Sequence, residues 1–385
     1  MVWKEYWAAT AGTFKRLGYP NIDDVSAEAA RRDALGAYGT YAPTAADTGA
    51  ITSEAILANG SNDYNSDVDA VNIPDGAVIM HKRIFGDITF LGTALLWDCL
   101  CVGGNNLITT GNKAVVFCNN DRTGVAVIRD CTIRARKESD GRDGFLGKQY
   151  TAERCNVSNV VDGFGIYNFT GGYNSASNVN VKGNYIHDHA YTYPDRDHSD
   201  GDHTDGVQCQ GGTNVNIIGN TLIGTGHYMA GSGTYYDTHA STDAGDWPLL
   251  MPTPRTPGSG ILVNGNQNAV DSTVVVDGNY IHYYKIPMNV GTQANGFVCT
   301  NNRFSVIDTP AKNVNGTVRN GVTLAFTANE YWVRLANQTT YNPNIIGLTT
   351  SGVVTNTTNK WMDGANVGVA LSAGRVQGIN DNQQA

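Results

Sequence analysis

The sequence is poor in charged side chains, and several common classes of protein are thereby excluded. Only 16% of the 385 residues are charged, Lys and Arg total 26, and the formal net charge is −9. Phosphate contacts need clustered basic side chains, so nucleic acid is not an expected partner. No stretch reaches the roughly 18 apolar residues of a membrane span, and the N-terminus lacks the apolar run of a secretory signal. We therefore expect no membrane partner and no cleaved signal peptide.

Cysteine chemistry is also sparse. The seven cysteines include no Cys-x-x-Cys pair and no Cys/His metal spacing. An odd number of this kind argues against a disulfide framework and predicts reduced, buried thiols. In contrast, glycine is abundant, with 45 residues, and this composition favours turns and strands over helices.

One pattern recurs along the chain: an apolar residue, two further residues, Asn or Cys, one residue, and a second apolar residue. The seven copies place these residues at the Asn or Cys position: Cys131, Cys155, Asn184, Asn220, Asn279, Asn302 and Asn329. Copies without an insertion between them are about 23 to 27 residues apart. Period-two apolar positions on both sides of the Asn predict two short strands that meet at a corner. We expect each Asn to adopt the left-handed backbone conformation and its amide to bond to the next copy, so that all seven residues form one internal column.

This repeat predicts an all-β fold, a right-handed parallel β-helix of about ten to twelve coils with a short helical segment before it. An antiparallel sandwich is the alternative, but it would not place Asn at one phase of a recurring unit. The short helix should start at Asp24 or Ser26 and stop at Gly36. The predicted divisions are a capping or attachment segment (1–48), the β-helix (49–365) with insertions at 187–204 and 226–258, and a tail (366–385).

Two strings carry a resemblance to a known family. DGVQCQGGTNVNIIGNTLIGTG, and SGILVNGNQ followed by STVVVDGNYIHYY, resemble the right-handed parallel β-helices of polysaccharide lyases, glycoside hydrolases and bacteriophage tailspikes. The opening VNIPDGAVIMHKRIFGDITFLG is similar to the first turn of phage spike helices, and TNTTNKWMDGANVGV resembles the last coil of β-helical minor tail proteins from phages of actinobacteria. The resemblance covers about residues 70 to 365 and specifies the fold better than the activity. It implies a homotrimer and contacts with other virion tail proteins through the N-terminal segment.

The two long insertions bracket the string DGVQ and differ in chemistry. Residues 187–204 are rich in Asp and His, whereas 226–258 are rich in aromatic residues, Gly and Pro. A polysaccharide site needs carboxylates that act as acid and base, and flat rings that stack on sugars, so the two insertions suit such a site. A solvated polar loop beside a packed aromatic loop would have the same composition and is the alternative. The candidate substrate-binding residues are Tyr228, Tyr235, Tyr236, Trp247 and Arg196.

A pair of Asp-Gly dipeptides supplies the candidate acids. Asp162-Gly163 and Asp205-Gly206 align at one corner of neighbouring coils, and with Asp277-Gly278 they are expected to make turns at corners other than the Asn corner. Two carboxylates about 4.8 Å apart would keep one acid protonated, unless both merely cap glycine turns. DHTDGV also resembles the Asn-Thr-Asp-Gly motif of polygalacturonases, but the family's Asp-Asp pair, Gly-His-Gly and Arg-Ile-Lys are missing. The candidate catalytic residues are Asp162, Asp202, His203 and Asp205.

A calcium loop is an open alternative for the acidic insertion. Asp195, Asp197 and Asp200 provide oxygen ligands at near-alternate positions, with glycine one position later than a calcium loop places it. No cofactor is otherwise required.

The leading hypothesis is a phage tail or tailspike protein that binds, and in one version hydrolyses, a host cell-surface polysaccharide. It would be made in the host cytoplasm and located in the virion. A free bacterial polysaccharide lyase or glycoside hydrolase and a purely structural virion protein are the rivals. Lyases that resemble this chain usually use Lys or Arg as the base, and few basic residues lie near the acidic loop in the sequence. For that reason alone, hydrolysis is favoured over elimination.

Overall fold

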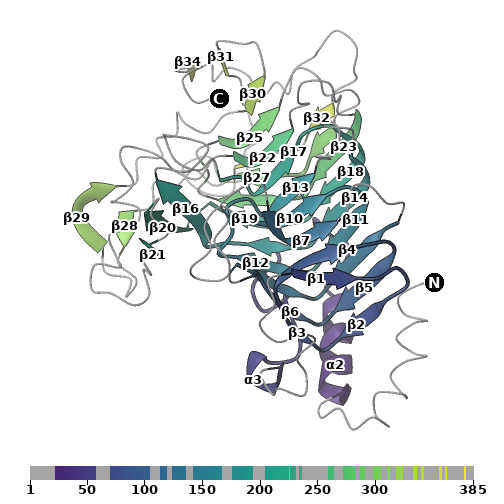
Figure 1. The fold of residues 1–385 in the computed structure, drawn as a ribbon. Helices are drawn as coiled ribbons and strands as arrows, with labels where there is room; N and C mark the ends of the chain where they lie inside the picture. The colour runs from purple at the N-terminus through teal and green to yellow at the C-terminus, as the bar shows by residue number, and fades with distance from the viewer. Residues whose placement is uncertain are drawn as a thin grey trace.

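The computed structural model is predominantly β, with two helices and three large parallel sheets among the residues that it describes (Figure 1). These are residues 22–57, 70–104, 113–118, 124–135, 142–166, 176–193, 204–224, 226–230, 234–235, 259–263, 272–282, 284, 286–290 and 298–304, with short strands at 310–312, 318–323, 333–335, 340–341, 355–357, 360–361 and 377–378. The expected all-β class is confirmed. The antiparallel sandwich is excluded because every pair of neighbouring strands in the three large sheets is parallel.

Each large sheet takes every third strand of the main series. The first sheet contains β1 (Ala70–Ile73), β4 (Asp87–Phe90), β7 (Lys113–Cys118), β10 (Arg142–Gly147), β13 (Phe164–Ile166), β17 (Val207–Cys209), β22 (Ser259–Val263), β25 (Ile286–Val290) and β30 (Val333–Leu335). The second contains β2 (Val78–Met80), β5 (Ala94–Trp97), β8 (Ala126–Arg129), β11 (Tyr150–Glu153), β14 (Ala176–Lys182), β18 (Gly212–Ile218), β23 (Ser272–Asp277), β26 (Val298–Thr300) and β32 (Thr355–Thr357). The third contains β3 (Arg83–Phe85), β6 (Leu100–Val102), β9 (Thr132–Arg134), β12 (Asn156–Ser158), β15 (Tyr185–Ile186), β19 (Thr221–Ile223), β24 (Tyr280–His282), β27 (Arg303–Phe304) and β33 (Lys360–Trp361). Successive triplets, each with one strand per sheet, therefore stack on one another.

The smaller elements lie outside these triplets. Three of them form a small sheet: β16 (His189–Tyr193), β20 (Gly226–Ala230) and β21 (Thr234–Tyr235). Two further pairs are β28 (Pro310–Lys312) with β29 (Val318–Thr323), and β31 (Thr340–Tyr341) with β34 (Gln377–Gly378). The helices are α2 (Ile22–Asp33) and α3 (Glu54–Leu57). Helix α2 thus begins before the expected Asp24 or Ser26, while Gly36, at φ 101°, follows its end as expected.

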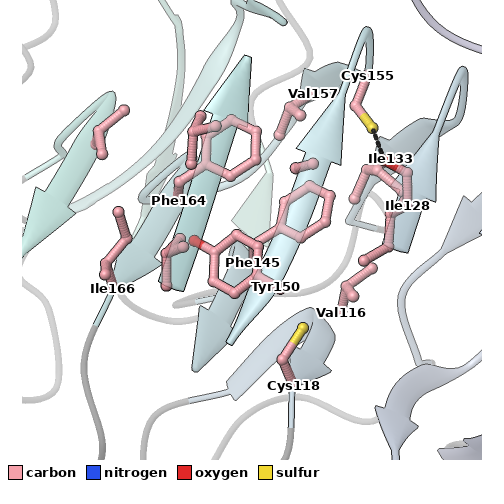
Figure 2. Close-up of a cluster of buried hydrophobic side chains, with 14 of the residues drawn as sticks. Val116, Cys118, Ile128, Ile133, Phe145, Tyr150, Cys155, Val157, Phe164 and Ile166 are labelled. Atoms are coloured by element: carbon pink, nitrogen blue, oxygen red, sulfur yellow. Dashed lines mark hydrogen bonds between the residues drawn. The ribbon is translucent and has the colours of Figure 1, made fainter. Parts of the chain in front are cut away.

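The interior between the sheets is a continuous apolar core. Side chains at alternate positions of the strands point inward, so that Ile128, Ala152 and Val181 stack in register and are fully buried. Figure 2 shows part of this core, where the rings of Phe145 and Phe164 stack with centroids 4.6 Å apart. The inward side chains of one triplet are buried by those at the equivalent positions of the next triplet, so each triplet depends on its neighbours for stability.

The seven cysteines belong to this core. All are buried and free, and Cys155 Sγ lies 3.6 Å from the carbonyl oxygen of Ile128 (Figure 2). Burial raises the pKa of Cys155, so the thiol form is favoured.

The predicted asparagine column is confirmed for Asn184, Asn220, Asn279 and Asn302, all of them fully buried. In each successive pair, the side-chain oxygen of the later Asn accepts bonds from the backbone N–H and from the amide of the earlier one, at 2.9 to 3.0 Å. The column continues into cysteine, because the Asn184 oxygen accepts the backbone N–H of Cys155 at 2.8 Å. The Asn amides therefore form hydrogen bonds between successive triplets, as the backbone groups of paired strands do.

The expected left-handed conformation of these Asn residues was wrong. The left-handed residue is the one before each Asn, and Gly183, Gly219 and Gly278 have φ of 64°, 65° and 64°. In three layers the left-handed residue is thus a glycine without Cβ, and before Asn302 it is Asn301, with φ 56°; in each case the following Asn side chain points inward. Gly278 therefore belongs to the Asn corner. The prediction that Asp277-Gly278 makes a turn at another corner, like the other two Asp-Gly dipeptides, was wrong.

The neighbour of the Asn302 repeat also differs from the prediction. The pattern around Asn329 lies outside the described residues, and the register instead pairs Cys299 with Asn356 and Phe304 with Trp361. Residues 355–361 therefore occupy the next layer. A six-residue pattern is short enough to recur by chance, and strand pairing decides between such copies.

The described part of the N-terminal segment packs along the Asn corner of the stack. Ala29 of α2 contacts Met80 and Trp97, and the backbone of Gly39 approaches Gly219 and Gly278 so closely that a Cβ on either would clash. The predicted boundaries at 48, 365 and 366, and the capping or attachment roles, stay predictions.

Buried charges fasten this segment. Asp130 has no exposed surface, and its carboxylate accepts two bonds from Arg154, at 2.8 and 2.9 Å, and one from Arg32 of α2, at 3.1 Å. Burial raises the pKa of Asp130, but these bonds and charges outweigh it and hold the pKa below its usual range.

Asp130→Asn is expected to lower the free energy of unfolding by about 3 kcal/mol, because it leaves buried guanidinium groups without their anion. A folded pKa below the unfolded value means that this stabilisation is present above about pH 4 and is lost as pH falls through the folded pKa. Urea unfolding at pH 7 and pH 3 measures both effects. Asp47→Asn, in the more exposed pair with Arg31, is the control and should cost less than about 1 kcal/mol. Equal losses for both variants would contradict the assignment.

Candidate functional site

A second polar column runs through the corner that leads into the first sheet. Asp143, Asp162 and Asp205 occupy equivalent positions before the core residues Phe145, Phe164 and Val207. Each carboxylate accepts the backbone N–H of the next layer: Asp143 from Asp162 at 3.3 Å, Asp162 from Asp205 at 2.7 Å, and Asp205 from Ser259 at 2.5 Å. We call these three residues the carboxylate column. The predicted proximity of Asp162 and Asp205 is confirmed, whereas their catalytic roles stay predictions.

Asp143 was missed in the sequence. It forms the same Asp-Gly dipeptide as the other two, but it follows a charged run, RARKESDGR, without the apolar pattern that marks the repeats. The signal that could have found it is the match of DGFLG at 143 with DGFGI at 162.

Glycine follows each acid because space demands it. A Cβ on Gly144 would lie 2.6 Å from the carbonyl oxygen of Gly163, one on Gly163 would lie 2.5 Å from that of Gly206, and one on Gly206 would lie 2.6 Å from that of Gly260. Such distances are shorter than real contacts, and backbone atoms cannot move aside cheaply. The Asp-Gly dipeptides thus make a tightly stacked corner.

The column is nearly closed to solvent, with exposed fractions of 7% for Asp143, 6% for Asp162 and 3% for Asp205. Burial raises the pKa of Asp143 to about 8 and that of Asp205 to about 7, while the backbone N–H groups of Asp162 and Ser259 oppose the shift. Near neutral pH these two carboxyl groups therefore carry protons for much of the time. Protonated carboxyl groups of this kind are able to act as acids.

A buried imidazole and phenol lie against the same corner. His189 Nδ1 lies 2.7 Å from the carbonyl oxygen of Val161 and Nε2 lies 2.6 Å from the hydroxyl of Tyr284. The carbonyl can only accept, so Nδ1 donates to it and Nε2 accepts from the phenol. Burial lowers the pKa of His189 to about 4 and keeps the ring neutral. The Tyr284 hydroxyl would lie 2.8 Å from a Cβ on Gly206, so it closes the corner beside Asp205.

The two long insertions come together beside this corner. Strand β16 belongs to the first insertion and β20 to the second, and they pair in parallel with Tyr191 opposite Tyr228. Strand β21 pairs with β20 in the antiparallel direction, with Tyr235 opposite Met229, so Tyr228 and Tyr235 occupy alternate phases of the small sheet. Figure 1 shows this sheet to one side of the stacked triplets. The expectation that both insertions fold over the same face is therefore supported where they are described.

The remaining predicted site residues lie outside the described part of the chain. They are the catalytic candidates Asp202 and His203, the binding candidates Arg196, Tyr236 and Trp247, and the calcium candidates Asp195, Asp197 and Asp200. Within the described ranges, no group of three or more His, Cys, Asp or Glu side chains is arranged to hold a metal ion.

No known protein family, curated protein or solved structure matches this chain. None of the helices in the described ranges combines the length and apolar character needed to span a bilayer.

Proposed function

We propose that the chain is a right-handed parallel β-helix of a phage tail or tailspike, and that it binds a host cell-surface polysaccharide on the flank carrying the two insertions. The β-helical part of the proposal is supported by the topology, since every third strand enters the same parallel sheet and the triplets stack in register. Parallel strands joined by crossover connections are right-handed in nearly all proteins, which favours that hand.

The observation that carries the glycan-binding part is the pairing of β16 with β20. Two insertions that leave a stack separately would not need to meet. Here five consecutive positions pair, from His189 with Gly226 to Tyr193 with Ala230. A strand pairing of this kind builds one continuous surface from both insertions, and it is rich in tyrosine. Tyrosine rings stack on the apolar faces of sugars and their hydroxyls bond to sugar hydroxyls.

A purified-component binding experiment tests this surface. The full chain is titrated with polysaccharide extracted from the surface of the host bacterium, and binding is followed by calorimetry. Tyr228→Ala should weaken binding about tenfold, which corresponds to about 1.4 kcal/mol. Tyr41→Ala, in the N-terminal segment, should leave the affinity unchanged. No binding by the unaltered chain, or equal losses for both variants, would contradict the proposal.

Hydrolysis of the bound glycan is a second candidate, favoured by one observation. Burial raises the pKa of Asp205 to about 7 beside Asp162, and a raised pKa is what an acid needs beside its partner carboxylate in glycoside hydrolysis. Homotrimer formation and attachment to other virion proteins through the N-terminal segment complete the proposal. Light scattering that gives the mass of the 41.1 kDa monomer would remove the trimer.

A further inference from the structure

Two columns in this protein carry out the same bonding task with different side chains. At one corner, the oxygens of Asn220, Asn279 and Asn302 accept the backbone N–H of the neighbouring layer. At the other corner, the oxygens of Asp162 and Asp205 do so. Asn and Asp have nearly the same shape, but only Asp gains a charge when it loses a proton. Three stacked, buried carboxyl groups therefore make one column sensitive to pH, whereas the Asn amides of the other column do not ionise.

The carboxylate column stands where the insertions return to the stack. Asp205 is the first residue after the insertion 187–204, and its N–H is bound by Asp162. Ser259 is the first residue after the insertion 226–258, and its N–H is bound by Asp205. The bonds of the column thus fasten the return points of both insertions to one another.

The other end of the first insertion is fixed at the same corner. His189, at the start of β16, binds the carbonyl oxygen of Val161 and the hydroxyl of Tyr284. Val161 is next to Asp162 in the chain, so the hydrogen bonds of His189 and of Asp205 connect the departure and the return of this insertion to the same two residues.

The groups around the column come from several elements. The phenol of Tyr284 faces Asp162 and Asp205, with neutral His189 behind it, and the phenol of Tyr150 lies in the field of Asp143. On β17, the side-chain amide of Gln208 lies 3.5 Å from Asp205. The guanidinium of Arg142, next to Asp143 in sequence, is directed to Asp87, to which it donates at 2.7 and 2.9 Å.

We propose that the carboxylate column is a proton-dependent latch for the two segments that begin at Asp205 and Ser259, closed while its buried carboxyl groups hold protons and loosened when they ionise. The latch acts on the surface of the small sheet without contacting a ligand, and it does not depend on what that surface binds.

The direction of the effect follows from proton linkage. In the closed latch the pKa of Asp205 is about 7 and that of Asp143 about 8, whereas an opened, solvated carboxyl group returns to an ordinary value near 3.8. Between about pH 4 and pH 7 the closed form holds more protons than the open form, so closing becomes less favourable as pH rises. Each such group contributes at most about a tenfold change in the opening constant per pH unit, and the dependence levels off above about pH 8.

Hydrogen exchange of the full chain measures this opening without any ligand. Amides in the segments 205–210 and 259–263 are followed from pH 5 to pH 9, with intrinsic exchange rates divided out, and compared with 276–282 at the Asn corner. We expect the opening constant to rise at least tenfold from pH 5 to pH 7 in the first two segments and to stay constant in the third. A flat profile in all three segments would overturn the latch.

Two variants sharpen the test. Asp205→Asn keeps the acceptor for the Ser259 N–H but cannot ionise, so it should reduce the pH dependence in 259–263. Asp277→Asn, whose carboxylate accepts from Thr300 and Asn301 at the other corner, is the matched control and should keep the unaltered profile. If Asp205→Asn does not fold, the exchange profiles of Asp143→Asn and of the unaltered chain still test the latch. A variant Asp205→Asn with the full original dependence would contradict the proposal.

Discussion

Asn220→Ala is expected to lower the free energy of unfolding by about 4 kcal/mol. The Asn220 oxygen accepts from the backbone N–H and the amide of Asn184, and its own amide donates to Asn279 and to the carbonyl oxygen of Val181. Alanine would leave these buried groups without partners and would add a cavity in a fully buried column. Urea unfolding of the two proteins, compared at equal m-value, measures the loss.

The matched control is Asn216→Ala. Asn216 lies at an outward-facing position of β18, where its amide donates to Asn180 at 3.1 Å and is partly exposed. Its loss should cost less than about 1 kcal/mol, because water replaces the bond. Similar losses for both variants would show that the internal column does not hold the layers together.

If the flank hydrolyses the bound glycan through this pair, Asp162→Asn and Asp205→Asn should each reduce cleavage by a factor of about 10² to 10⁴, the usual contribution of a general acid or base. Each substitution keeps an oxygen that accepts the N–H of the next layer, so the corner should stay folded. Asp205→Asn removes the proton that this buried acid can give to a leaving group, and Asp162→Asn removes the carboxyl group beside it. Product release from the host polysaccharide, followed by reducing-end assay, measures the change.

Asp277→Asn serves as the control for this prediction as well, because it alters an Asp-Gly dipeptide at the Asn corner. Unchanged cleavage in both column variants would contradict an acid role for the pair. Binding of the polysaccharide by the unaltered chain with no product would assign the flank to adhesion alone, without affecting the proposed binding surface.

The sequence was most informative where the same residue type recurs at the same position of the repeat and makes the same contact in each layer. Asn184, Asn220 and Asn279 could be aligned because a buried amide has few other uses at that spacing, and the register confirms them. The two earliest layers were not found. Leu96, Cys99 and Cys101 fit the Asn-or-Cys pattern but were not aligned, whereas Lys82 stands at that phase in the first layer and fits neither residue type. The resemblance marked 355–361 as a last coil, but the repeat did not predict that it follows the Asn302 layer directly. A long stretch intervenes after Phe304, and only strand pairing identifies the partner.

The candidate site was predictable in part for similar reasons. Asp162 and Asp205 could be paired because both precede Gly within matching strings, and the hydrogen bond between them confirms their proximity. The contributions of His189 and Tyr284 could not be foreseen, since they are far apart in sequence and neither belongs to a motif. Burial was not foreseen either. The sequence suggested acids on an open groove, whereas the structure encloses the two described carboxyl groups within the corner.

Mass spectrometry of density-gradient-purified virions tests the central claim most directly. Peptides of this chain are expected to co-purify with the particle at a fixed ratio to the other tail proteins, with a copy number per particle that is a multiple of three. A chain that is found only in the particle-free supernatant of the lysate would contradict a virion protein and would favour a free enzyme.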